Sequence, residues 1–172
     1  MRYPKTCKID KVVPRGGDRY SPTHAVLDLA DDDAPVMVAT DGKRLVVVPV
    51  TLDDGDVGGM VPTDAIKAAA RRRKSDDAVI ACNGRCDVLD GPSFARETDT
   101  RRFPAWREVV PTKGTETLKI NVKLLAELGA AIGAEEVTLS WTRDPDGSVT
   151  TGVRVESESG DAWGLQMPLV VI

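Results

Sequence analysis

The chain has 172 residues, of which 41% are hydrophobic and 29% are charged, and its formal net charge is -4. These values are typical of a soluble protein with its own core, and the length allows one domain or one and a half. They exclude a globally basic nucleic-acid binder, although a local basic face remains compatible with them. The sequence has no apolar run of membrane-spanning length and no signal-peptide core at its start, so we expect a cytoplasmic protein.

Short strands are predicted before residue 50. Runs of β-branched and other apolar residues indicate strands at 25–29, 36–39 and 45–50, with a further strand near 8–13. The segment 13–23 between them contains two prolines and two glycines, a composition that opposes a helix.

An internal repeat organises the remainder of the chain. Each copy begins with a short strand that leads into a helix, for which Pro62 and Asn121 are suitable start residues. The first copy covers the segments 60–67, 78–82, 85–89 and 94–98. The second copy covers the segments 119–126, 137–141, 149–155 and 162–171. Both copies are predicted to form a strand, a helix and three strands, and the segment before residue 50 is the same unit with its helix reduced to a loop.

Three cysteines are present, at Cys7, Cys82 and Cys86. Cys82 and Cys86 flank the sequence Asn83-Gly84, which is a strong signal for a two-residue hairpin turn. Such a turn would pair Cys82 with Arg85 and place the two thiols on opposite faces of the sheet. We therefore expect reduced thiols, and neither a disulfide nor a metal knuckle.

Catalytic and metal signatures are weak. The acidic loops 31–33 and 53–56 lack the ligand spacing of an EF-hand, so we expect solvated turns and no metal site, and an Asp-dependent metal nuclease is a minor alternative. The single histidine, His24, is more often a satisfied turn or strand residue than a base. Because nucleophile-elbow, phosphate-loop and zinc motifs are absent from the sequence, neither an enzyme nor a cofactor is expected.

Three stretches mix apolar side chains with turn-forming Gly or Pro at the edges of predicted strands: 38–45, 103–111 and 164–169. In this order, with the repeat between them, they resemble segments of the bacterial DNA polymerase III beta sliding clamp. In that family the matching segments line a surface pocket that grips short peptides of clamp-binding proteins. The resemblance covers nearly the whole chain, from the family's middle domain across a linker into the end of its last domain.

The resemblance implies an α+β protein with the DNA-clamp fold, built from repeated strand-helix-three-strand half-domains with antiparallel sheets. It implies about three half-domains in this chain, where the family has six. Residues 1–111 would form a complete two-half domain with its linker, and residues 112–172 would form one half-domain.

The resemblance also implies a peptide-binding pocket drawn from all three stretches. Its members would be Thr40, Gly42, Lys43, Arg44, Leu45, Pro104, Val109, Leu165, Met167, Pro168 and Leu169. The apolar members would form a floor for Leu and Phe anchors, and the cations at the rim would take an acidic or C-terminal group of the peptide. Without the resemblance, the apolar members are read as ordinary core residues. Lys43 and Val170 depart from the family, where histidine and arginine are common at these positions.

Cations gather on the helix predicted from 63 to 74, and positions 67, 71 and 74 share one of its faces. In clamps such helices present cations to the DNA backbone, a contact that is independent of sequence and weakens with salt. The DNA-contacting residues implied in this way are Lys67, Arg71, Arg72, Arg73, Lys74 and Lys123. The alternative is a solvated helix end, where cations also favour the helix dipole.

The resemblance therefore implies a reduced, non-enzymatic processivity factor that encircles or contacts duplex DNA. It would form a homo-oligomer and tether a DNA polymerase or another replication or repair protein, with no membrane partner. The alternative is a non-encircling adaptor or decoy that binds only clamp-binding peptides. The lost first helix and the weakly basic second helix favour this alternative. The sequence leaves open the oligomeric state, the partner, the need for a loader and a phage or host origin.

Overall fold

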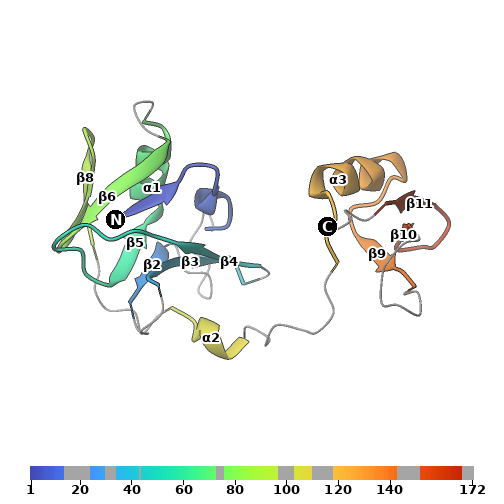
Figure 1. Cartoon of the computed structure of the whole chain (residues 1–172), viewed down its shortest axis with the longest axis horizontal. Helices are drawn as coiled ribbons and strands as arrows, with labels where there is room; N and C mark the ends of the chain where they lie inside the picture. Colours follow the sequence, from blue (N-terminus) through green and yellow to red (C-terminus); the bar gives the residue numbers. More distant parts are fainter. Residues whose placement is uncertain are drawn as a thin grey trace. The chain divides into compact units, whose positions relative to one another are not determined.

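A computed structural model of the chain is shown in Figure 1. It describes residues 1–13, 24–29, 34–42, 44–72, 76–96, 103–109, 118–142 and 152–167, without the side chain of Val109. The chain divides into two compact units, Met1–Val110 (unit 1) and Pro111–Ile172 (unit 2), and each unit is described by itself. In these ranges, no helix is both long enough and apolar enough to cross a membrane.

Two antiparallel sheets make up the described part of unit 1. The first has the order β4-β3-β2-β5 and comprises β4 (Leu45–Pro49), β3 (Val36–Thr40), β2 (His24–Asp28) and β5 (Gly59–Pro62). The second has the order β1-β6-β7-β8 and comprises β1 (Arg2–Pro4), β6 (Asp77–Cys82), β7 (Arg85–Val88) and β8 (Ser93–Ala95). The helical segments are η1 (Ile9–Lys11), α1 (Thr63–Ala70) and α2 (Trp106–Val109).

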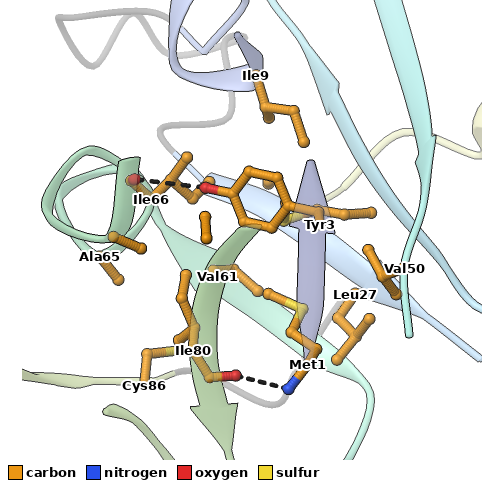
Figure 2. Close-up of a cluster of buried hydrophobic side chains, with 14 of the residues drawn as sticks. Met1, Tyr3, Ile9, Leu27, Val50, Val61, Ala65, Ile66, Ile80 and Cys86 are labelled. Carbon is orange, nitrogen blue, oxygen red and sulfur yellow. Dashed lines mark hydrogen bonds between the residues drawn. The ribbon is translucent and has the colours of Figure 1, made fainter. Parts of the chain in front are cut away.

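One hydrophobic core lies between the two sheets and α1 (Figure 2). Helix α1 buries Ala65, Ile66 and Ala69, at the spacing that places apolar residues on one helix face. The hydroxyl of Tyr3 in β1 donates a hydrogen bond to the carbonyl oxygen of Ile66 at 3.4 Å. Burial of a side chain the size of Ile66 contributes about 1.5–3 kcal/mol to the core, and the hydrogen bond links β1 to α1.

Unit 2 contains a three-stranded antiparallel sheet among its described residues. Its strands are β11 (Trp163–Gln166), β10 (Val153–Ser157) and β9 (Val137–Ser140), in the order β11-β10-β9, and its helix is α3 (Val122–Ala131). The side chain of Asn121 accepts hydrogen bonds from the backbone N–H groups of Lys123 and Leu124, which confirms the predicted helix start. A Cβ atom at position 164 would lie 2.5 Å from Leu128 of α3, so Gly164 lets the helix lie close to the sheet.

The structure differs from the sequence-based prediction at several elements. The predicted strand near 8–13 is wrong, because residues 9–11 form the 3-10 turn η1, with Ile9 buried beside α1. The N-terminal strand is β1, whose three residues are too few for a recognisable pattern and which forms by pairing with β6. Residues 118–121 form no strand before α3. Helix α1 ends at Ala70, short of the predicted end at residue 74.

The predicted turn between β6 and β7 is also wrong. Cys82 pairs directly with Cys86, so the connection has three residues and both thiols lie on the same, buried face. A two-residue turn of the predicted type needs positive φ at Asn83 and at Gly84. Of these two residues only Gly84, at φ 105°, adopts a positive value. The partner of Cys82 is therefore Cys86, one residue beyond the predicted partner Arg85.

Candidate functional site

The hairpin between β3 and β4 carries the first group of predicted pocket residues. Thr40 is buried, and its hydroxyl donates to the carbonyl oxygen of Arg44 at 2.8 Å and accepts from the N–H of Gly42 at 3.1 Å. Gly42 has φ 83°, a conformation that favours glycine, so the turn depends on this residue. Thr40 therefore shapes the turn from inside and does not present its hydroxyl to a ligand.

Arg44 is held at the rim of this hairpin. Its Nε donates to Asp41 Oδ2 at 2.9 Å, and its Nη2 donates to the carbonyl oxygen of Lys11 in η1 at 2.9 Å. The guanidinium is thus fixed in direction while most of the side chain remains exposed. Lys43, the other predicted rim cation, lies outside the described residues.

The linker packs on the same sheet face as Leu45. Phe103 is 8% exposed and forms a small cluster with Val26 and Met60, against which Leu45 and Trp106 also pack. Leu45 and Phe103 of the linker therefore belong to one cluster, although they are far apart in sequence. In unit 1, however, Leu45 is a partly buried member of this cluster and not an open floor residue.

Strand β2 anchors the linker through residues that the sequence reasoning missed. The indole Nε1 of Trp106 donates to Asp28 Oδ2 at 2.8 Å, and Arg107 forms an ion pair with the same oxygen. The Arg107 guanidinium also stacks over the Trp106 ring, 4.4 Å from its centroid. The adjacent Trp106 and Arg107 could have indicated that the linker is anchored by side-chain contacts, but nothing in the sequence identified Asp28 as their partner.

A cleft of about 630 Å³ opens beside this anchor. It is lined by the end of β2, by Gly58 and Gly59, and by linker residues 103–108. Pro104 lines it, whereas Thr40, Gly42, Arg44 and Leu45 do not. Val109 is the last residue of α2, and its side chain is not among the described ones.

The two described pocket residues of unit 2, Leu165 and Met167, lie on one exposed sheet face. Trp163, Leu165 and Met167 alternate along β11 and just beyond it, and they are 57%, 57% and 59% exposed. Leu165 lies over Gly152, where a Cβ atom would come within 2.3 Å of its side chain. Within unit 2, neither Leu165 nor Met167 is therefore a core residue. Pro168 and Leu169 lie outside the described residues, and the convergence of this group with the hairpin and linker stays a prediction.

The predicted basic helix is only partly described. Lys67 lies 3.8 Å from Asp64 in a loose ion pair, and Arg71 and Arg72 are exposed in the turn after α1. Lys5, which the sequence reasoning missed, donates to the carbonyl oxygen of Arg72 at 2.5 Å and adds a cation there. Arg73 and Lys74 lie outside the described residues. In unit 2, Lys123 is 84% exposed and lies 4.0 Å from Glu127.

The acidic loop 53–56 is more than a solvated turn. The side chain of Asp56 is only 2% exposed and forms an ion pair with the ammonium group of Met1, which corrects the expectation for this residue. Burial disfavours the charge of Asp56, but hydrogen bonds from Met1 and from two backbone N–H groups outweigh burial and lower its pKa. Among the described residues, no group of three or more His, Cys, Asp or Glu is placed to hold a metal ion.

Comparisons with known proteins bear on the fold. No family model matches the chain, and no curated protein matches it. A solved structure that does match is the C. crescentus beta sliding clamp, described with polyethylene glycol bound to a region proposed to tether the beta motif. It has a TM-score of 0.67 and 18% sequence identity, and the match covers 98% of this chain and 50% of that chain. The chain thus spans about half of that protein's length, and the predicted DNA-clamp fold, with antiparallel sheets and few helices, is confirmed.

Proposed function

We propose that this chain is a reduced, non-catalytic sliding-clamp-like protein that tethers replication or repair proteins and contacts duplex DNA. The observation that carries the proposal is the clamp fold along 98% of the chain. Coverage of half of the clamp structure supports three half-domains where the family has six. If the ring keeps the twelve half-domains that the resemblance implies, four such chains of three half-domains would close it, with head-to-tail contacts between neighbours.

Peptide capture would use the three stretches named from the sequence. The fixed guanidinium of Arg44 supports its role at a rim, because it is exposed and already oriented. The exposed pair Leu165 and Met167 supports an apolar floor in unit 2. Methionine adapts its shape to different side chains, which suits a site that takes Leu and Phe anchors from several partners.

Contact with DNA would use the cations around the end of α1. Exposure of Arg71 and Arg72, and the neighbouring Lys5, supports a local basic surface on a chain whose net charge is negative. Such a surface would bind phosphates without reading bases, and its affinity would fall steeply as salt increases.

The second candidate is a non-encircling adaptor or decoy that binds only clamp-binding peptides. Two observations favour it. The segment 13–23, which replaces the first helix of the repeat, has a composition that opposes a helix, and Lys123, the only cation of α3, lies near an acidic residue. Both candidates keep the peptide pocket, so they differ in assembly and in DNA contact.

Light scattering across a wide concentration range separates the two candidates. A closed assembly of about four chain masses would support the encircling clamp. A monomer at every concentration would contradict self-assembled encirclement and leave the adaptor. For a closed assembly, retention on nicked circular DNA and release when the circle is cut would establish encirclement, since simple backbone contact would survive linearisation.

A further inference from the structure

The closed end of the β6–β7 hairpin holds two thiols in register. Cys82 and Cys86 are directly paired across the two strands, and their sulfur atoms lie 3.9 Å apart. Both residues are 0% exposed, and both belong to the main core of unit 1. Cys86 is drawn within this core in Figure 2.

We propose that Cys82 and Cys86 form an oxidation site that closes to an intramolecular disulfide on reaction with a peroxide. In the first step the Cys82 thiolate attacks one oxygen of hydrogen peroxide, and the O–O bond breaks. This gives a sulfenic acid on Cys82 and a hydroxide ion, which takes up the proton that the thiol released. In the second step the sulfur of Cys86 attacks the sulfenic sulfur, the S–O bond breaks and water leaves with the Cys86 proton. Two thiols are oxidised, and one peroxide is reduced to two water molecules.

The strand geometry permits this bond. Directly paired residues of antiparallel strands have Cα atoms about 4.5–5.5 Å apart, which lies within the range of about 4.4–6.8 Å that disulfides span. Because both side chains already lie on the same face, rotation of the side chains is enough to bring the sulfur atoms together. The two-residue turn expected from the sequence would have placed them on opposite faces and prevented the reaction.

The surroundings give the two thiols different roles. A hydrogen bond from Cys86 stabilises the thiolate of Cys82 and lowers its pKa, while the same interaction raises the pKa of Cys86. Burial opposes the charge on Cys82, and the guanidinium of Arg96, which donates to the Cys82 carbonyl oxygen at 2.8 Å, favours it. Cys82 is therefore the attacking thiol, and Cys86 is the thiol that resolves the sulfenic acid.

Access to the pair runs through the hairpin tip. Asn83, Gly84 and Arg85 are exposed, and the cysteine pair is the last rung of the β6–β7 ladder before them. Opening of the last rung is a local event that leaves the sheet core paired. The reaction is therefore expected to be slower than that of an exposed thiol and to occur in the folded protein.

Peptide mapping tests the proposal on the whole chain. The folded protein is treated with hydrogen peroxide, alkylated under denaturing conditions and digested with trypsin. Arg85 lies between the two cysteines, so cleavage separates them into peptides 75–85 and 86–96 unless a disulfide joins these peptides. We expect the number of alkylated thiols to fall from three to one, with Cys7 alkylated and the two peptides linked. Three free thiols, oxidation beyond sulfenic acid at either cysteine, or a link to Cys7 would overturn the proposal.

Two variants assign the roles of the thiols. Cys7→Ser is the matched control and should still form the link. Cys86→Ser should stop at the sulfenic acid of Cys82, which dimedone traps as a stable adduct. Dimedone on Cys7 alone in this variant would contradict the assigned attacking thiol. If Cys86→Ser does not fold, the map of the unmodified sequence still decides the proposal.

Discussion

The indole Nε1 of Trp106 donates a hydrogen bond to Asp28 Oδ2 at 2.8 Å, across 78 residues of sequence. Arg107 pairs with the same carboxylate and stacks on the indole, so one acidic residue of β2 holds two consecutive residues of α2. Because Pro104 lies two residues before Trp106, this contact fixes the start of the linker against unit 1. The linker part of the candidate pocket is therefore preorganised by Asp28.

Removing this anchor should loosen the linker. Asp28→Ala removes the acceptor of a charge-assisted hydrogen bond, which should lower the stability of the linker contact by about 1–3 kcal/mol. We expect the fluorescence of Trp106 to shift toward that of an exposed indole, measured with Trp141 and Trp163 replaced by Phe. Asp28→Asn is the control, because its amide oxygen still accepts from the indole. An unchanged emission spectrum in Asp28→Ala would contradict the anchor.

A charge on the exposed face of unit 2 should weaken peptide capture. Met167→Asp places a carboxylate where an apolar anchor would dock, and we expect a loss of about 2 kcal/mol in the binding free energy of a clamp-binding peptide. Fluorescence anisotropy with a labelled peptide measures this loss. Ala126→Asp adds the same charge to an exposed position of α3, which packs on the opposite face of the sheet through Leu128 and Gly164, and it should leave the affinity unchanged. Equal affinities of the two variants would remove Met167 from the binding surface.

Charge reversal after α1 should reduce DNA association. Arg71→Glu with Arg72→Glu removes two cations from the proposed contact, and we expect weaker binding and a salt dependence that is shallower by about two units of slope. Titration of a labelled duplex at several salt concentrations gives both quantities. Arg85→Glu with Lys119→Glu makes the same change in net charge at two other exposed positions. The assignment fails if both double variants bind the duplex alike.

Arg96 should be a major contributor to the stability of unit 1. Its guanidinium donates to the carbonyl oxygens of Val57, Met60 and Cys82, at 2.6, 3.1 and 2.8 Å, and so joins residues of both sheets. Arg96→Met leaves these carbonyl groups without that donor and should lower the free energy of unfolding by about 3 kcal/mol. The midpoint of urea unfolding measures the change. Arg85→Met, at an exposed position, should cost no more than about 0.5 kcal/mol, and an equally small effect at Arg96 would refute its structural role.

Asp56 should make the protein sensitive to acid. Its folded-state pKa lies below the ordinary value of 3.8, so its contribution is fully present above that value. The contribution is lost as the pH falls through the lowered pKa, because the protonated carboxyl no longer pairs with the Met1 ammonium. Urea unfolding from neutral pH down to about pH 2 should show a steep loss of stability for the natural sequence. The Asp56→Asn variant should have a lower free energy of unfolding at neutral pH, and this free energy should fall less as the pH decreases. Parallel curves of unfolding free energy against pH for the two proteins would contradict this role.

Local patterns in the sequence accounted for much of the fold. The strand at 78–82 was predictable from its run of apolar residues, as was the Asn121 cap of α3. Both features depend on residues that are close together in the sequence, so a short stretch of sequence is enough to predict them. For the candidate pocket, the hairpin, the linker and the residues of β11 were predicted from the sequence. Within unit 1, the structure places Leu45 against the cluster that contains Phe103 of the linker.

The sequence by itself therefore determined the repeated order of a helix followed by three strands and the short stretches that resemble a clamp. Only the tertiary structure decided the anchor of Trp106 on Asp28, the burial of Asp56 beside Met1 and the facing thiols of Cys82 and Cys86. The first two contacts join residues 55 or more positions apart and depend on how the sheets and linker pack. The third depends on the three-residue connection between β6 and β7, since one residue more or less in a turn moves every later side chain to the other face of its strand.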